Sequence, residues 1–445
     1  MSRSVAAQRL GTAPPVPKRL TVVRGWLGRR RYPLLAATAL IAVGMFTTTW
    51  GSGLTKTLEA QLTGKPAFAL PADLWSTLVA GMRVLHLNLG GLYTAPTGLI
   101  SFPGAALIFV PVVALNEAVG FGLGAPSAAN PHPAAWLLAG PYEMGLSCVA
   151  LFAADSLAER LGVVSSPKRA LLALVGVIAL GNVSLAGGHP EDAVAVGLLL
   201  FGVLALSNGQ GRRSAWLIGA AIAVQPLVLL AVPVIAATVE PRQLPGYVAR
   251  AAAPAALLVG IALAANPAAT FTAIARQPNW PQVDHTTPWL WLAPPMSGGA
   301  VATGPARSVA IVVACGCAIF VWRRWQRTER APVWSPEFLR DVLWWVAAML
   351  AVRSAFEPVM VAYYVWPALA VALITASCRW SCLIPASLVV LVTTFVSGAG
   401  WRNPWTWWGA MVAGLALALL TARAPVSRAR LRQCCEILRG RRARA

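Results

Sequence analysis

Long apolar runs, separated by short polar connections, follow one another along almost the whole chain. Most runs approach the roughly 17–25 residues that cross about 30 Å of hydrocarbon as a helix, and a helix satisfies its own backbone hydrogen bonds in lipid. The pattern predicts an all-α, polytopic integral membrane protein of about 11–13 transmembrane helices. The predicted spans lie near residues 33–50, 99–119, 135–156, 170–186, 192–207, 214–238, 250–266, 308–322, 338–353, 361–377, 382–398 and 406–421.

Residues 73–89 have a different pattern from the spans on either side. Leu74, Leu78 and Met82 recur at helical spacing, which predicts an amphipathic helix lying at the membrane interface. Asp73 stands in its first turn. Capping explains a carboxylate there, because it accepts backbone N–H bonds and suits the helix dipole. A partly buried carboxylate at a fixed point is also suited to act as a general base.

The balance of charge points to a membrane rather than to nucleic acid. The chain is 57% hydrophobic and 11% charged, against roughly 25% charge in an average soluble domain. Its formal net charge of +21 comes from Lys and Arg that gather in the N-terminal arm, in "WRRWQRTER" and in the C-terminal tail. Basic residues beside spans set orientation and attract anionic lipid. We therefore expect anionic membrane lipids, and no nucleic acid, as partners of the basic termini.

The basic connections also predict which side each part of the chain faces. By the positive-inside rule, residues 1–32 form a cytoplasmic arm, residues 33–421 form the transmembrane domain, and residues 422–445 form a cytoplasmic tail. The outer side then receives the first loop, the turn "GGHPEDA" and the loop 267–306. The predicted location is the plasma membrane, crossed several times, with both termini cytoplasmic.

If all the predicted spans cross the membrane in alternating directions, the predicted sides of the connections are not reproduced at two places along the chain. The sides agree if 99–119, which holds two prolines, only dips into the membrane. The predicted sides also require residues 214–238 to form a short helix, to turn at Gln225–Pro226 and to run back as a second helix. Proline disrupts a helix at that point.

The seven cysteines indicate neither a disulfide framework nor a metal site. They include adjacent and i,i+2 pairs, but no Cys-x-x-Cys pair and no histidine companion at metal-ligand spacing. We expect no metal and no cofactor.

The predicted outer side gathers an unusual share of the few ionisable groups. In "GGHPEDA", Pro190 suits the first helical position, and Glu191 and Asp192 suit the positive end of the helix that follows. Helix capping explains these acids but leaves His189 unexplained. Ionisable groups at membrane depth are costly and mark function, so the turn is a candidate binding site.

His285 lies in a loop rich in Trp and Pro, "RQPNWPQVDHTTPWLWLAPP". The tryptophans are typical of a membrane-interface belt, and they are equally suited to stack against a sugar ring. The histidine is either a structural loop residue or part of a site that the outer loops form together.

Several segments, in this order, resemble the GT-C membrane glycosyltransferases of actinobacteria, particularly the polyprenol-phosphate-mannose-dependent mannosyltransferases of glycosyltransferase family 87. An acid, an amphipathic helix and a Gly- and Tyr-containing turn occur in "ADLWSTLVAGMRVLHLNLGGLYTAPTG". The polar turn in "GNVSLAGGHPEDAVAVGLLLFGVLAL", the broken span "GAAIAVQPLVLLAVPVIAA" and the late "VAYYVWPALAVAL" are similar to further family segments. The chain departs from the family at Gln225, where many members carry Lys.

The resemblance implies a GT-C fold and the transfer of a sugar, most simply mannose, from a polyprenyl-phosphate carrier to a glycolipid or lipoglycan acceptor on the outer side. Asp73 would then be the catalytic base. A cation for the leaving phosphate would come from Arg83, Arg276, His189 or His285. The implied substrate-binding residues are Tyr93, His189, Glu191, Asp192, Gln225, His285, Tyr363 and Tyr364.

Two other classes of protein fit the same pattern. A transporter or lipid flippase also predicts a polytopic bundle with broken helices and ionisable groups at its binding site. A structural partner in a cell-envelope complex predicts instead that Asp73 is replaceable without loss.

Overall fold

Helix dominates the computed structural model, as the apolar runs predict, with 79% of it helical. The structure describes residues 25–26, 28–49, 72–94, 98–99, 101–123, 134–281, 284–327, 334–399 and 403–423. Most of the predicted basic arm, nearly all of the tail and part of the first outer loop lie outside these residues. The α-helices are α2 (Arg31–Thr49), α4 (Ala72–Leu85), α5 (Pro103–Ala118), α6 (Trp136–Ser147), α7 (Val149–Arg160), α8 (Ser166–Gly181), α9 (Pro190–Ser207), α10 (Gly211–Val224), α11 (Val232–Ala236), α12 (Leu244–Ala265), α13 (Pro267–Phe271), α14 (Gly304–Arg327), α15 (Pro336–Ala355), α16 (Trp366–Ala376), α17 (Trp380–Ser397) and α18 (Pro404–Ala422).

Short turns of other helix types and one small sheet connect these elements. The strands β1 (His285–Thr286) and β2 (Val359–Met360) pair antiparallel, with His285 opposite Met360. The short helical turns are η1 (Leu89–Gly91), η2 (Asn182–Ala186), η3 (Pro226–Ala231), η4 (Thr272–Arg276), η5 (Pro288–Leu292), η6 (Ser297–Gly299) and η7 (Ala362–Val365).

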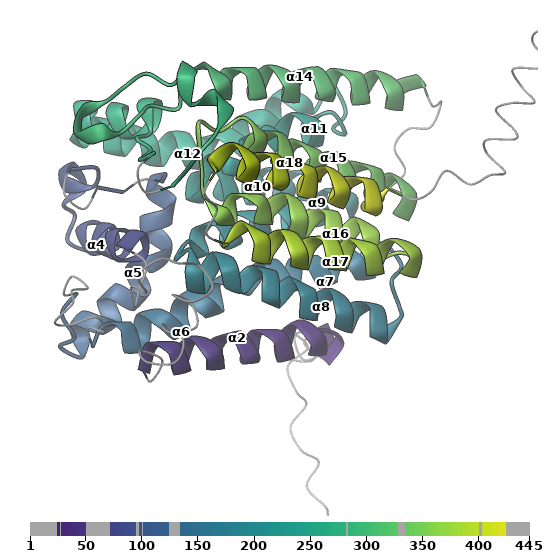
Figure 1. Cartoon of the computed structure of the whole chain (residues 1–445), viewed down its shortest axis with the longest axis horizontal. Helices are drawn as coiled ribbons and strands as arrows, with labels where there is room; N and C mark the ends of the chain where they lie inside the picture. The colour runs from purple at the N-terminus through teal and green to yellow at the C-terminus, as the bar shows by residue number, and fades with distance from the viewer. Residues whose placement is uncertain are drawn as a thin grey trace, which may run out of the picture.

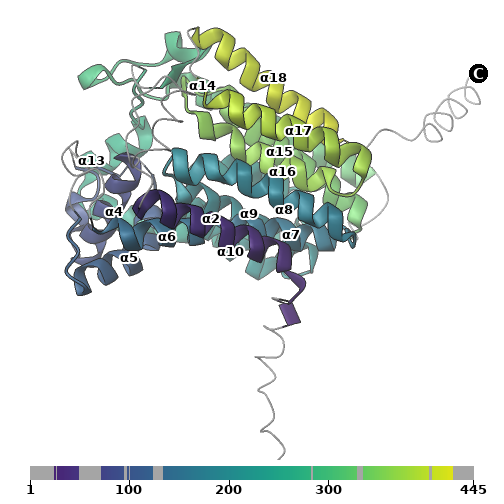
Figure 2. The ribbon, with the colours of Figure 1, turned by 60° about the horizontal axis from the view of Figure 1, so that its bottom comes forward.

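The apolar helices bear out the prediction of a polytopic, all-α membrane fold at the coarse level. Among the described residues, seven helices are long and apolar enough to cross a membrane, and shorter apolar helices accompany them. The long ones are Trp136–Arg160, Ser166–Leu185, Pro190–Ser207, Leu244–Ala265, Gly304–Gln326, Trp380–Ser397 and Pro404–Ala422. Most of the helices run along the horizontal axis of Figure 1, and the turned view in Figure 2 shows the same bundle, with α4 and α5 at its left-hand end.

The chain reverses at Gln225, as its sequence predicts. The α10 helix ends one residue earlier, and Gln225 has extended backbone angles of φ −149° and ψ 117° before Pro226 begins η3. The next long helix, α12, therefore starts at the same end of the bundle as α10. The two run parallel, because Ser214 contacts Tyr247 through their hydroxyls at 2.9 Å near both helix starts.

The segment predicted as the span 99–119 is a shorter element at one end of the bundle. Its helix, α5, has 16 residues and packs against α4 through an apolar cluster that includes Leu74, Leu78 and Phe109. α5 therefore belongs with the shorter apolar helices, and its dip into the membrane stays a prediction. The structure confirms the amphipathic helix, since Leu74 and Leu78 are fully buried; α4 ends at Leu85, a turn earlier than predicted.

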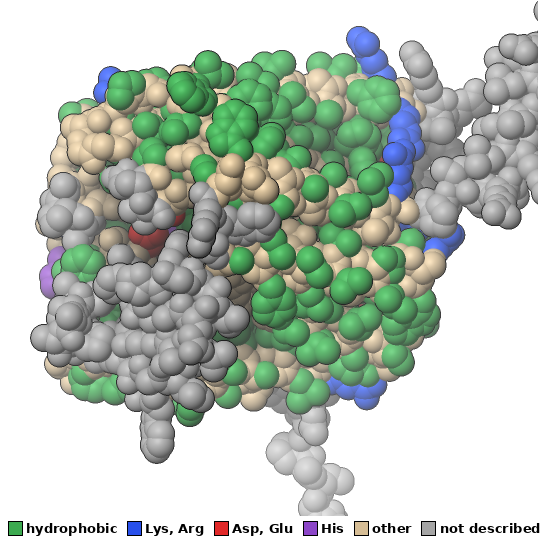
Figure 3. Space-filling model, in the orientation of Figure 1, with side chains coloured by type: hydrophobic (Ala, Val, Ile, Leu, Met, Phe, Trp, Pro, Cys, Tyr) green, Lys and Arg blue, Asp and Glu red, His purple; other side chains and the backbone are tan. Residues whose placement is uncertain are grey.

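The basic connections meet at the end of the bundle opposite α4 and α5, which we call the basic end. The Arg160 guanidinium donates to the carbonyls of Ser207 and Trp334 at 3.1 and 2.9 Å. The Lys168 ammonium donates to the Cys378 carbonyl at 2.7 Å. In Figure 3, Lys and Arg side chains follow the right-hand edge of the visible face, while Asp and Glu side chains show at the left.

Candidate functional site

His189 joins two carboxylates at the end of the bundle that carries α4. Its Nε2 lies 3.1 Å from Oδ2 of Asp73, in the first turn of α4, and its Nδ1 lies 2.7 Å from Oε1 of Glu191, in the first turn of α9. His189 is the residue before Pro190, where α9 begins. Gly188 precedes it with φ +65°, a conformation that favours glycine. Two of the segments that the sequence places on the outer side, the first loop and "GGHPEDA", therefore meet in the structure, and we call Asp73, His189 and Glu191 the acid–histidine cluster.

The acid–histidine cluster runs from a solvent-accessible carboxylate to a buried one. The side chain of Asp73 is 48% exposed, that of His189 is 11% exposed and that of Glu191 is 2% exposed. Burial opposes the charged form of His189, but the neighbouring carboxylates outweigh it and raise the pKa of His189 well above its usual value. Burial likewise opposes ionisation of Asp73, and the hydrogen bond and charge of His189 outweigh it and lower the Asp73 pKa.

One oxygen of Asp73 is left for another partner. Oδ2 takes the contact with His189, and within the described part of the chain no hydrogen bond is made to Oδ1. The backbone carbonyl of Asp73 accepts a bond from the Thr77 hydroxyl at 2.9 Å, which belongs to the helix and not to the carboxylate. Asp73 is therefore a half-exposed carboxylate that is held in place through one of its oxygens.

The chain reversal at Gln225 places the side-chain amide of this residue beside Asp192, which follows Glu191 in the first turn of α9. The Gln225 Nε2 donates to Oδ1 of Asp192 at 2.7 Å. Asp192 is 2% exposed, so this contact gives a buried carboxylate a hydrogen-bond donor. Both residues were predicted to contribute to the site, and the structure brings them together.

The two tyrosines of the late segment also reach this end. The Tyr363 ring packs on the His189 ring, with centroids 4.4 Å apart and an interplanar angle of 30°. The Tyr364 ring meets Tyr363 edge-on at 5.1 Å. A Cβ added to Gly187 would lie 2.8 Å from Cδ1 of Tyr363, so the glycine before the cluster permits this close approach.

Tyr93 and His285, two further predicted residues, contact other parts of the chain. The Tyr93 hydroxyl is buried and donates to the Ser101 carbonyl at 3.0 Å. The Ser101 hydroxyl in turn donates to the Val224 carbonyl at 3.0 Å, so Tyr93 supports the loop beside the reversal. The His285 ring stacks on Trp407 at 4.0 Å with an interplanar angle of 15°.

The arginine nearest to the two tyrosines was missed by sequence reasoning. The guanidinium carbon of Arg353 lies 3.9 Å from the centroid of the Tyr364 ring, and its Nε lies 3.3 Å from Glu357. By contrast, Arg83 donates to carbonyls of its own loop, those of Gly91 and Thr94. The available signal was the pair of charges in "RSAFEP" at the end of an apolar run.

Glu143 is a second residue that the sequence did not single out. It lies in α6 and is 3% exposed, and none of the described residues forms a hydrogen bond with its Oε2. Oε2 of Glu191 is also buried without a partner. A lone acid in an otherwise apolar run was the available signal. Such a group is costly at membrane depth.

The groups of this arrangement are suited to proton transfer. Among the described residues, no group of three or more His, Cys, Asp and Glu side chains has the geometry to hold a metal ion. A half-exposed carboxylate, an imidazole between two acids and further buried acids can instead accept and hold protons. Comparisons with protein-family models, with curated proteins and with solved structures found no match to this chain.

Proposed function

We propose that the protein is a GT-C type glycosyltransferase that moves a sugar from a polyprenyl-phosphate carrier to a glycolipid or lipoglycan acceptor. The observation that carries this proposal is the contact between Asp73 and His189, which fixes an accessible carboxylate beside a buried turn. The reaction needs one base at a fixed position, and the acid–histidine cluster offers one.

In this reaction the free oxygen of Asp73 takes the proton of the acceptor hydroxyl. The acceptor oxygen attacks the anomeric carbon of the donor, and the bond between that carbon and the phosphate oxygen breaks. The electron pair of that bond leaves with the polyprenyl phosphate, and the proton remains on Asp73 until water removes it. His189 holds the other Asp73 oxygen, which fixes the direction of the base.

The leaving phosphate requires a cation nearby. Arg353 is the best candidate, because its guanidinium lies over Tyr364, and Tyr364 packs against the tyrosine that covers His189. Arg353 replaces Arg83 in this role, since the Arg83 guanidinium donates to its own loop. The tyrosine rings are suited to flank a sugar, with Asp192 and Gln225 bonding its hydroxyls.

The proposed site lies on the outer side of the plasma membrane, and the basic end lies on the cytoplasmic side. Cysteine labelling tests this assignment in a variant whose own cysteines are replaced. A cysteine at position 285 is expected to react with a membrane-impermeant maleimide in intact cells, and one at position 208 only after lysis. Labelling of position 208 alone in intact cells would reverse the assignment.

Replacing Asp73 by Asn tests the proposed reaction directly. Asn keeps the size and the contact with His189 but cannot accept the proton, so transfer from a radiolabelled polyprenyl-phosphate sugar should fall by about 100-fold or more. Glu117→Gln is the matched control, because Glu117 forms an exposed pair with His86 at 2.8 Å. Normal transfer by the Asp73→Asn protein, inserted in membranes at the usual level, would refute the proposed base.

A transporter or flippase is the second candidate, and a specific observation favours it. Glu143 lies inside a helix long enough to span, and both Glu143 and Glu191 have a buried oxygen without a partner. Such acids are typical of proton-coupled transport. Reconstituted protein that translocates a labelled lipid in vesicles, with loss in Glu143→Gln but not in Asp73→Asn, would favour this function over glycosyl transfer.

A further inference from the structure

A cleft opens at the basic end, far along the bundle from the acid–histidine cluster. It has a volume of about 750 Å³, which falls within the range of small-molecule sites. The ends of α7 and α9, the beginning of α10 and the turn before α2 surround it. Its lining residues are Trp26, Arg30, Ser156, Glu159, Arg160, Phe201, Leu204, Ala205, Asn208, Gln210, Arg213 and Leu217.

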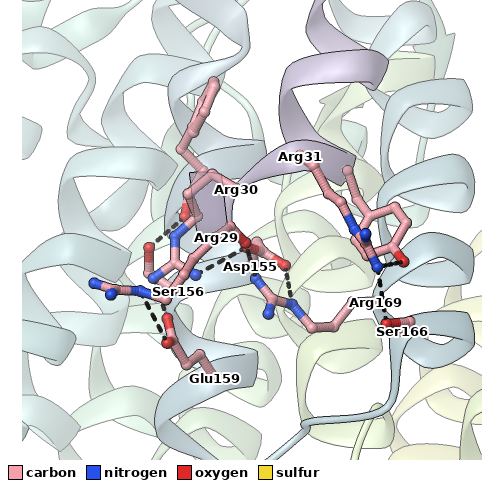
Figure 4. A network of polar contacts seen from close by, with 10 residues as sticks. Arg29, Arg30, Arg31, Asp155, Ser156, Glu159, Ser166 and Arg169 are labelled. Carbon is pink, nitrogen blue, oxygen red and sulfur yellow. Dashed lines mark hydrogen bonds and ion pairs between the residues drawn. The ribbon is translucent and has the colours of Figure 1, made fainter. Parts of the chain in front are cut away.

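The polar part of the cleft carries more positive than negative charge. Arg30, Arg160 and Arg213 line it, against the single carboxylate of Glu159. Figure 4 shows how Arg30 is fixed, with its guanidinium between Glu159 and Asp155. Arg213 is exposed, and among the described residues its one hydrogen bond is a long contact of 3.4 Å with Gln210, which leaves its guanidinium able to bind an anion in the cleft.

The other wall of the cleft is apolar. Phe201 and Leu204 come from α9, and Leu217 comes from α10. Leu217 lies six residues after Gly211, where α10 begins, which places it about 9 Å inside the helix end at 1.5 Å per residue. Trp26 covers the cleft from the turn before α2 and stacks on Phe152 at 5.7 Å. The cleft therefore has a cationic mouth and an apolar interior.

We propose that this cleft binds an anionic phospholipid, with the headgroup phosphate at Arg213 and Arg160 and the upper part of an acyl chain along Phe201 and Leu217. Charge selects an anion, and the apolar wall selects one that carries a hydrocarbon chain. A free phosphate or nucleotide would leave that wall in contact with water. The position suits a lipid, because basic pockets between helices at a positive membrane face bind anionic headgroups. This inference does not rest on the proposed reaction.

Native mass spectrometry of the purified full-length protein in neutral detergent tests the site. Phosphatidylglycerol is titrated in, with phosphatidylcholine and glycerol 1-phosphate in separate arms. Phosphatidylglycerol should bind with one saturable site, phosphatidylcholine should bind more weakly, and glycerol 1-phosphate should not compete. Arg213→Gln should weaken phosphatidylglycerol binding about fivefold, the effect of one cation near a membrane surface. Leu217→Trp, which fills the apolar wall, should reduce it further.

Arg212→Gln is the matched control, because Arg212 is the exposed neighbour of Arg213 and does not line the cleft. It should leave the affinity within twofold of the unchanged protein. Equal losses in Arg212→Gln and Arg213→Gln would overturn the proposal, because they would show a diffuse charge effect. Equal binding of the two lipids, or competition by glycerol 1-phosphate, would also overturn it.

Discussion

The two ends of the bundle hold their buried charges in opposite ways. At the basic end, Asp155 is 3% exposed and lies between two guanidinium groups, with Arg30 Nη1 at 3.1 Å and Arg169 Nε at 2.7 Å. At the other end, His189 is the imidazole between two acids, and both Glu191 and Glu143 retain a buried oxygen without a partner. One end has cations around an acid, and the other has acids around a single histidine.

From this difference we infer that the Asp155 network at the basic end is structural and that the acid–histidine cluster is the candidate functional site. A buried ion pair contributes to stability only when its geometry is good and further hydrogen bonds satisfy the remaining polar atoms. The Asp155 network comes close to this, although Nε of Arg30 has no partner within the described part of the chain. The network joins the residue before α2, the second half of α7 and the beginning of α8 (Figure 4). Around His189 the acids outnumber the cations, and within the described part of the chain Oε2 of Glu191 and Oε2 of Glu143 are buried without a hydrogen-bond partner. Arrangements that break the rules of stable folding are expected where function requires them.

Removing the acid of the basic end should have the largest effect on stability. Asp155→Asn leaves Arg30 and Arg169 facing each other without their shared carboxylate, and breaking a buried pair costs about 3–5 kcal/mol. The free energy of unfolding, measured in mild detergent, should fall by that amount. Asp341→Asn is the control at the same end, because its pair with Arg324 is 3.8 Å long and 31% exposed on the acid side. Asn can still accept the hydrogen bond that the Trp325 indole donates to Asp341 at 3.0 Å, so this variant should lose less than about 1 kcal/mol. Equal losses would mean that Asp155 has no special structural role.

Removing an acid at the other end should raise the free energy of unfolding instead of lowering it. Glu143→Met keeps a similar length and removes the buried oxygen without a partner, so the free energy of unfolding should rise by about 1–2 kcal/mol. Activity should fall in the same variant if the acid belongs to the functional site. A loss of stability as large as that of Asp155→Asn would show that the contrast between the two ends is wrong.

The acid–histidine cluster should also give stability a defined pH dependence. Because the carboxylates raise the pKa of His189 above its unfolded value of 6.5, its contribution is complete below that pH and is lost as pH rises through the raised pKa. The lowered pKa of Asp73 adds a contribution that is present above its unfolded value of 3.8 and is lost as pH falls through the lowered pKa. Among the described residues, the titratable groups near His189 are Asp73, Glu191, Asp192, Glu143 and Tyr363.

The measurement is the unfolding temperature in detergent as a function of pH, for the unchanged protein and for His189→Gln. The unchanged protein should lose stability on the alkaline side, and the variant should show a smaller slope there. Parallel curves for the two proteins would exclude a charged His189 from the cluster.

Much of the fold follows from the sequence because the bilayer restricts the choices. Apolar runs of span length predict helices, and the proline after Gln225 predicts the reversal that the structure has. The short helix within 99–119 is less predictable, since its apolar pattern alone does not separate it from a span; the dip into the membrane rests on the charge topology and stays a prediction. The GT-C assignment goes beyond the coarse fold and stays a prediction.

Site residues were predictable where the local sequence marks them. Contacts between distant segments were not, because they depend on tertiary packing. A histidine before Pro190 and two acids after it marked the turn, and Asp73 followed a span. The pairing of Asp73 with His189, 116 residues apart, depends on how α4 lies across the bundle. The stacking of His285 on Trp407 is equally non-local. Glu143 was missed because a single acid inside an apolar run carries no spacing pattern.

The smallest effect is expected from the exposed histidine–acid pair at the same end as the cluster. His86 and Glu117 are 2.8 Å apart, but their side chains are 56% and 40% exposed, so water screens the contact. Glu117→Gln should change the free energy of unfolding by less than about 1 kcal/mol and leave the pH profile unaltered. The cluster around His189 has the same two residue types, so this variant isolates burial as the cause of the difference. A pH-dependent loss in Glu117→Gln as large as that caused by His189→Gln would mean that burial is not what distinguishes the two pairs.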